Sequence, residues 1–111
     1  MHEQSFRKAS RAGVKIAFGA DVGGFPWAEP IAQEFEREVA FGMTPMQAIQ
    51  SATIRAAELL GLQGKAGVIA PGAWADLVAV GGNPADDVAA LKEVLFVIKS
   101  GQVFTAPEPI R

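Results

Sequence analysis

An apolar run that ends in a carboxylate constrains the fold of this chain more than any other stretch. The run covers residues 14–18 with one charged member, Lys15, and Asp21 follows just before a pair of glycines. Strands buried on both faces of a parallel sheet have nearly continuous apolar sequences. We therefore predict a buried strand over residues 14–19 that presents Asp21 at its carboxyl end, where ligands and catalytic groups gather in such folds. From the residues alone a simpler role, capping of a turn or of the next helix, is favoured for Asp21.

The size and charge of the chain exclude several classes of protein. Its 111 residues suit one domain of ordinary size and not two. A net charge of −2, with both signs interspersed, argues against a nucleic-acid partner and against a polybasic membrane anchor. The chain has no cysteine, no apolar stretch of the roughly 20 residues that span a membrane, and no signal-peptide core at its start. We expect a cytoplasmic protein, and we assign no chemistry to the terminal His2.

Two helices are predicted on either side of the strand and its glycine-rich loop. The first covers residues 3–12 and carries several basic side chains. The second, residues 30–42, should direct an apolar stripe inward, because Ile31, Phe35 and Val39 recur at a spacing of four. Its charged side chains should then lie on the other faces.

The next helix has the clearest start in the sequence. Thr44 suits the N-cap, Pro45 the first helical position and Gln47 the capping-box position, so we expect Thr44 and Gln47 to be structural. Gly61 is placed for a left-handed C-cap. The apolar stripe between them indicates a helix core rather than a cofactor site; it comprises Met46, Ile49, Ala52, Thr53, Ala56, Ala57 and Leu60.

Beyond residue 61 the sequence becomes rich in glycine and changes to short apolar pieces typical of strands and turns. Asp86 or Asp87 can cap a short helical turn over residues 88–91, and Ser100 and Gly101 suit a two-residue hairpin connection. The strands are predicted, in order, at residues 68–69, 75–80, 94–99 and 102–105.

Four segments together make a pattern that extends across nearly the whole chain. They read IAFGADVG (16–23), GMTPMQAI (42–49), ATIRAAELLG (52–61) and GVIAPGAWADLV (67–78). In order and spacing, these segments resemble the carboxy-terminal part of the metal-dependent amidohydrolase superfamily. The similarity is greatest to its imidazolonepropionase-like and Xaa-Pro dipeptidase-like branch.

The resemblance implies an α/β fragment with two parts. Residues 1–61 would be the end of a (β/α)8 barrel, with a helix, the last barrel strand and two helices. Residues 62–111 would be the C-terminal strands of the small β-sandwich that accompanies the barrel. A complete barrel takes roughly 250 residues, so this chain cannot form one alone.

The resemblance also changes the interpretation of Asp21. Asp21 matches the aspartate that, in such enzymes, contacts the catalytic metal and accepts the proton of the attacking water, and this role now displaces that of a turn cap. Phe25 and Trp27 would lie on the loop over the site, either shaping the substrate pocket or packing there. Asp76 matches a position that we expect to be structural, with hydrogen bonds to local backbone.

The other metal ligands of the family have no counterpart in this sequence. They are an HxH pair on the first strand, a lysine or its equivalent in the middle of the barrel and two later histidines. We therefore expect a divalent metal, zinc, in the complete enzyme and none in the isolated chain, since a catalytic site needs about three protein ligands.

Three hypotheses of function follow. The first is a fragment of an enzyme that hydrolyses amide or peptide C–N bonds in small substrates, with Xaa-Pro or Xaa-basic dipeptides ahead of cyclic amides, and that is inactive as an isolated chain. The second is a split enzyme whose barrel strands come from another polypeptide. The third is a non-catalytic module that self-associates through apolar faces left without their usual cover.

Overall fold

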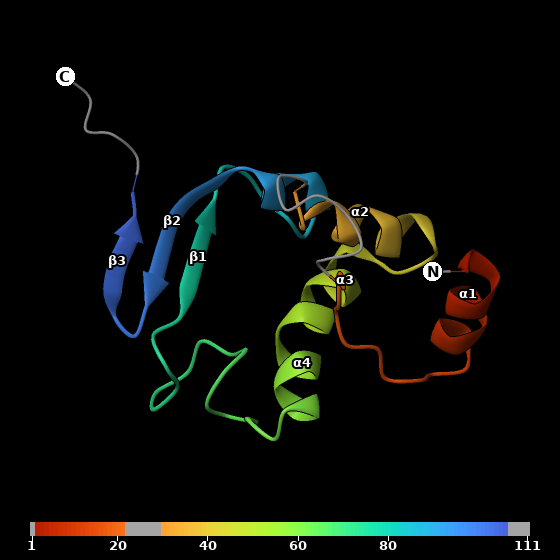
Figure 1. Ribbon diagram of the computed structural model, residues 1–111, viewed down its shortest axis with the longest axis horizontal. Coiled ribbons are helices and arrows are strands. Elements are labelled where there is room, and N and C mark those ends of the chain that lie inside the picture. The colour runs from red at the N-terminus through yellow and green to blue at the C-terminus, as the bar shows by residue number, and fades with distance from the viewer. Residues whose placement is uncertain (1, 22–29, 107–111) are drawn as a thin grey trace.

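The helices and the sheet of this chain lie on opposite sides of the molecule (Figure 1). The structure is a computed structural model that describes residues 2–21 and 30–106. The elements in chain order are α1 (Glu3–Arg11), α2 (Gln33–Ala40), α3 (Pro45–Ala52), α4 (Ile54–Leu59), β1 (Leu77–Val80), the 3-10 helix η1 (Val88–Lys92), β2 (Val94–Lys99) and β3 (Gln102–Thr105).

The strand predicted over residues 14–19 is wrong. Residues 14–21, here called the Asp21 segment, have no regular secondary structure, and Val14 is 55% exposed. A strand exists only when a neighbour pairs with its backbone, and the described residues form one sheet, β1-β2-β3, which does not include this segment. Two backbone hydrogen bonds tie the segment to the helices, from Val14 N to Ala9 O at 3.1 Å and from Phe18 N to Ser51 O at 3.0 Å.

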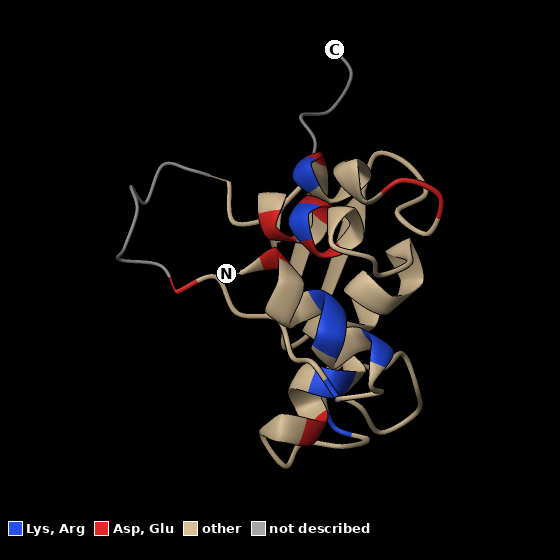
Figure 2. Ribbon diagram, turned by 90° about the vertical axis from the view of Figure 1, so that its right-hand side faces the viewer, with Lys and Arg blue, Asp and Glu red and all other residues tan. Residues whose placement is uncertain are grey.

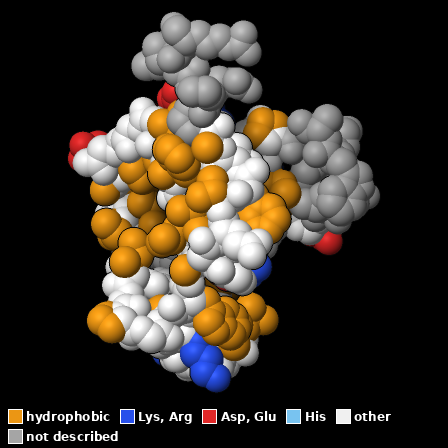
Figure 3. Space-filling model, turned by 90° about the vertical axis from the view of Figure 1, so that its left-hand side faces the viewer, with side chains coloured by type: hydrophobic (Ala, Val, Ile, Leu, Met, Phe, Trp, Pro, Cys, Tyr) orange, Lys and Arg blue, Asp and Glu red, His pale blue; other side chains and the backbone are white. Residues whose placement is uncertain are grey.

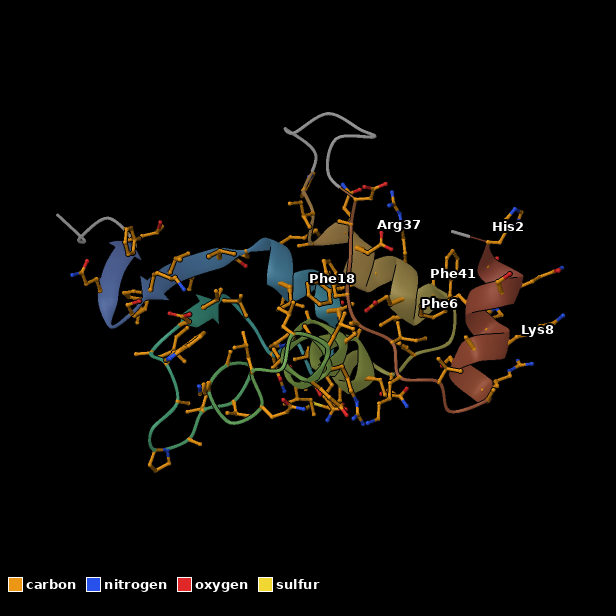
Figure 4. All side chains as sticks on the ribbon, turned by 60° about the horizontal axis from the view of Figure 1, so that its bottom comes forward. His2, Phe6, Lys8, Phe18, Arg37 and Phe41 are labelled. Carbon is orange, nitrogen blue, oxygen red and sulfur yellow. The ribbon has the colours of Figure 1, made fainter. Side chains whose placement is uncertain are left out.

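The first helix packs through one aromatic contact. Phe6 is the buried residue of α1, and its ring meets that of Phe41 edge to face with centroids 5.9 Å apart (Figure 4). Arg7 of the same helix donates to the carbonyl of Ala40 at 2.8 Å and so caps the end of α2. The helix predicted over residues 3–12 is therefore confirmed, one residue shorter than expected.

The predicted inward stripe of α2 is right for Phe35, which packs on Phe18, but wrong for Ile31 and for the face that is buried most. The helix begins at Gln33, after a turn over residues 30–32, and Ile31 remains 44% exposed. The buried side chains are Glu34 and Glu38, with exposed fractions of 9% and 2%. The two glutamates also recur at a spacing of four, so periodicity defines two stripes on this helix. Packing decided between them, because the fold places Ser51 within hydrogen-bond distance of Glu38.

The predicted start of the next helix is confirmed. Gln47 N donates to Thr44 Oγ1 at 3.2 Å, and Thr44 N donates to Gln47 Oε1 at 2.9 Å, which completes the capping box. The single helix expected up to residue 60 is instead two helices with a break at Thr53, whose φ is −118° and ψ −94°. The Thr53 hydroxyl donates to the carbonyl of Ile49 at 2.9 Å, a bond that competes with regular helix geometry.

The end of α4 follows the prediction, whereas the core stripe does so only in part, since Ala57 is buried. Gly61 has a φ of +70°, and the amide of Leu62 donates to the carbonyl of Ala57 at 2.7 Å, as in a Schellman cap. Met46 and Leu60, predicted as core, are 48% and 70% exposed. The residues of α3 and α4 that are buried are small ones, Ala48, Ser51 and Ala57.

The sheet is a three-stranded antiparallel meander with the order β1-β2-β3. Ser100 and Gly101 have φ values of 51° and 78°, so both central residues of the β2–β3 turn are left-handed and the predicted two-residue hairpin is confirmed. Asp87 rather than Asp86 caps η1, accepting from the amide of Ala89 at 2.9 Å. The strand predicted at residues 68–69 is wrong, because that segment forms bends in which Ile69 is 91% exposed.

All buried residues of the described chain belong to the helices. They are Phe6, Glu34, Glu38, Ala48, Ser51, Ala57 and Val88. No residue of β1, β2 or β3 is buried, and Val78, Val103 and Phe104 are more than 60% exposed. Hydrophobic side chains accordingly gather on the surface at the sheet end of the molecule (Figure 3). The core therefore lies in the helical half, and the sheet adds apolar surface without a layer over it.

Charged side chains of both signs occur over the helical half (Figure 2). Among the described residues, Lys92 of η1 forms an ion pair with Glu36 of α2 at 3.0 Å, and other pairs lie within one helix, such as Arg37 with Glu34 at 3.1 Å. None of the helices in residues 2–21 and 30–106 is both long enough and apolar enough to cross a membrane.

We predict that Gly67→Ala destabilises the chain far more than Gly72→Ala. Both glycines have a positive φ, +73° and +86°, so each substitution costs about 1 kcal/mol of backbone strain. A Cβ at Gly67 would also lie 2.4 Å from the carbonyl oxygen of Thr53, whereas at Gly72 it meets nothing within 4 Å. Overpacking adds about 1–3 kcal/mol. Urea denaturation of both variants measures the difference in their free energies of unfolding. Equal losses of stability would contradict the close contact between Gly67 and Thr53 at the helix break.

Candidate functional site

Asp21 lies at the exposed end of the Asp21 segment in a backbone conformation that few residues adopt. Its φ is 49°, within the left-handed region. Such values are uncommon outside glycine, although aspartate tolerates them better than most side chains. Ser100, with a similar φ, is explained by its hairpin turn. Residues held in sparsely populated conformations cluster at functional sites, so the geometry of Asp21 favours a functional role.

Contacts with three helices hold the Asp21 segment in place. The ring of Phe18, labelled in Figure 4, stacks on that of Phe35 in α2, with centroids 4.6 Å apart and 30° between the planes. The amide of Phe18 bonds the carbonyl of Ser51 in α3, as described above. Lys15 forms an ion pair and a hydrogen bond with Glu58 of α4, and this contact lowers the pKa of Glu58. These contacts fix the chain three residues before Asp21.

The segment also borders two open hollows, each of about 200 Å³. One lies against Ser10, Gln47 and Gln50, the other against Glu58 and Leu59, and Lys15 and Ile16 line both. Asp21 lines neither of them. Its carboxylate is therefore on the surface of the described chain and not inside either hollow.

The described residues do not fit a metal ion by themselves. In residues 2–21 and 30–106, no three His, Cys, Asp or Glu side chains are grouped as metal ligands would be. A catalytic metal needs about three protein ligands, and Asp21 offers one carboxylate. Phe25 and Trp27, predicted on the loop over the site, lie outside the described residues.

The residues expected to be structural lie apart from Asp21 in the fold. Thr44 and Gln47 form the capping box of α3. Asp76, just before β1, accepts a hydrogen bond from Lys99 Nζ at 2.7 Å and one from Ser100 N at 2.8 Å. Lys99 first, and then the Ser100 amide, lower the pKa of Asp76. No hydrogen bond between described residues joins Asp21 to any of these side chains.

The sequence prediction missed one buried polar pair, Glu38 and Ser51. Ser51 Oγ lies 2.8 Å from Glu38 Oε2 and 2.7 Å from the carbonyl oxygen of Ala48. Burial raises the pKa of Glu38 to about 7; the bond to Ser51 opposes this rise and the negative charge of Glu34 adds to it. The recurrence of glutamate at positions 34 and 38 is the only sequence pattern that points to a buried acidic pair, and the same pattern is equally typical of a solvent-exposed helix face.

Comparison with known proteins places the chain in one family. Residues 2–104 match the model of the amidohydrolase family. Among solved structures, a Xaa-Pro dipeptidase with bound methionine in the active site is 45% identical, with a TM-score of 0.87 over 94% of this chain. A prolidase complexed with N-methylphosphonate-L-proline is 34% identical with a TM-score of 0.80 over 95% of the chain. An ochratoxinase from A. niger is 33% identical with a TM-score of 0.81 over 99% of the chain. Comparison with curated proteins gives no match.

The match covers only part of each solved structure. This chain spans 25% of the dipeptidase, 26% of the prolidase and 27% of the ochratoxinase. The resemblance to prolidase-like amidohydrolases found in the sequence is thus confirmed, for a segment about a quarter of their length.

We predict that Asp76→Ala opens the β2–β3 hairpin at its turn. The substitution removes the acceptor of the Ser100 amide and the partner of Lys99, so hydrogen exchange at Ser100 and Gly101 should quicken severalfold. Because folding lowers the pKa of Asp76, its contribution is present at neutral pH and is lost on acidification through the folded-state pKa. Exchange measured by NMR tests this, with Asp86→Ala as the control, and unchanged protection of Ser100 would contradict it.

Proposed function

This chain belongs to the amidohydrolase family, and on that premise we propose that it is the C-terminal part of a metal-dependent hydrolase that cleaves C–N bonds in small substrates. The observation that carries the proposal is the match to a quarter of a Xaa-Pro dipeptidase at a TM-score of 0.87. Residues 1–61 would supply the end of the barrel and residues 62–111 part of the adjoining sandwich. The Asp21 segment would then become a strand when neighbouring barrel strands pair with its backbone.

Asp21 is the residue to which we assign the proton transfer. In the complete protein its carboxylate accepts a proton from the attacking water and returns it to the leaving nitrogen. The exposed position and left-handed φ of Asp21 support this role. Enzymes of this family generally use divalent metal ions, and we propose zinc; its remaining ligands belong to parts of the fold that these residues do not supply.

The substrates that we propose are dipeptides with proline in the second position. Two of the similar structures are named as a Xaa-Pro dipeptidase and a prolidase, and the second was complexed with a proline phosphonate. Phe25 and Trp27 would line the pocket for the substrate. Dipeptides with a basic second residue and cyclic amides are the alternatives for the same C–N chemistry.

The isolated chain should be inactive and should bind the rest of the fold. The apolar sheet residues Val78, Val103 and Phe104 are exposed, as expected when a covering layer belongs to another part of the protein. That layer would come from the same polypeptide or from a separate one in a split enzyme. The same exposed surface favours the second candidate function, a non-catalytic module that self-associates in the cytoplasm.

We predict that this chain, fused in place of the matching quarter of the Xaa-Pro dipeptidase, restores zinc-dependent hydrolysis of Xaa-Pro dipeptides. Asp21→Asn in the chimera should lower the rate by about 10²–10⁴-fold, because general-base catalysis contributes that much. The amide keeps the size of the side chain and its tolerance of a left-handed φ, so the chimera should fold. Asp86→Asn is the matched control, because Asp86 is remote in sequence and its side chain bonds Asn83 within the described part of the chain.

Two outcomes would contradict the proposal. Hydrolysis of dipeptides by the isolated chain with zinc would show that the remaining three quarters of the enzyme fold are not required. A folded chimera that loses no activity on Asp21→Asn would remove the assigned role of Asp21. Light scattering of the isolated chain tests the second candidate, which predicts an oligomer whose size increases with concentration.

A further inference from the structure

We propose that Glu38 is kept as a neutral acid inside the helical core and that its ionisation loosens the packing of α2 on α3. The inference rests on the geometry of Ser51. A hydroxyl group carries one proton, yet Ser51 Oγ lies within hydrogen-bond distance of two oxygens, 2.8 Å from Glu38 Oε2 and 2.7 Å from Ala48 O. A carbonyl oxygen and an ionised carboxylate are both acceptors only. With an ionised Glu38 the single Ser51 proton must be shared between the two oxygens, whereas a protonated Glu38 that donates to Ser51 makes both short contacts full hydrogen bonds.

The surroundings of Glu38 offer no charge to balance an ionised carboxylate. Glu38 and Ser51 are 2% and 1% exposed, and no ion pair among the described residues includes Glu38. Glu34 of α2 is also buried, and its negative charge disfavours a second one at Glu38. An uncompensated buried charge is among the costliest features in a protein.

Among the described residues, no cation on the packed elements forms an ion pair with Glu38. Arg37 of α2 pairs with Glu34 at 3.1 Å, Lys92 of η1 pairs with Glu36 at 3.0 Å, and α3 has no charged residue. Arg7 of α1 pairs with Glu3 and donates to the carbonyl of Ala40. The neutral acid is therefore the form that this core accommodates.

Protonation of Glu38 links pH to stability near neutrality. Burial raises its pKa to about 7 from the ordinary value of 4.5, so the folded chain holds this proton more tightly than the unfolded chain does. Stability is then greatest below the unfolded pKa and falls as pH rises to about 7, with the unfolding equilibrium constant increasing by up to about tenfold per pH unit. Ser51 also bonds Phe18 through its carbonyl, so the loosened packing would reach the Asp21 segment.

The test is urea denaturation of the whole chain between pH 5 and pH 8. The wild-type midpoint should fall across this range. Glu38→Gln should keep its midpoint unchanged, because the amide donates to Ser51 as the neutral acid does and carries no charge. Glu36→Gln is the matched control on the same helix and should retain the wild-type fall in midpoint, because Glu36 lies on the surface with Lys92. Equal pH dependence in the wild type and Glu38→Gln would overturn the proposal.

A direct titration decides the question if Glu38→Gln does not fold. In wild-type protein labelled with ¹³C-glutamate, the carboxyl shift of Glu38, assigned through its bonded neighbours, should titrate with a midpoint near 7. A midpoint near the ordinary 4.5 would show that Glu38 is ionised in the fold and would overturn the proposal.

Discussion

The buried hydrogen bonds of Ser51 hold together three parts of this structure. The Ser51 hydroxyl lies against Glu38 of α2 and against the carbonyl of Ala48 in its own helix, while its backbone oxygen accepts from Phe18. Serine is small enough to let α2 and α3 approach closely, and its side chain is 1% exposed. Ser51 therefore joins the buried contact between α2 and α3 to the Asp21 segment, which Phe18 and Lys15 also hold in place.

Features with a local physical cause were predictable from the sequence. The capping box of Thr44 and Gln47 involves residues three apart, and the hairpin at Ser100 and Gly101 depends on the conformations of two residues. Features that depend on a distant partner were not. Nothing near Glu38 in the sequence indicates that Ser51 will meet it, and the apolar pattern of residues 14–19 predicts a strand without supplying the strands that would pair with it.

The candidate site likewise combines a feature that the local sequence predicts with one that depends on distant parts of the protein. The residues around Asp21 left its role open between a turn cap and a catalytic carboxylate, and only the resemblance to a family chose between them. The family is confirmed, whereas the role of Asp21 stays a prediction, because three quarters of each similar solved structure has no counterpart in this chain. The three strands of the sheet could also be predicted from the sequence. The layer that covers the sheet could not, because an apolar strand sequence does not identify what packs on it.

The left-handed backbone at Asp21 also limits how this position can change during evolution. Asparagine and glycine adopt that conformation readily, whereas β-branched residues do not. Both are one nucleotide away from aspartate in the genetic code, and neither has a carboxylate. A single mutation could therefore remove the carboxylate at this position without any change in the path of the backbone. The backbone conformation alone would then not show whether a homologue still has the carboxylate.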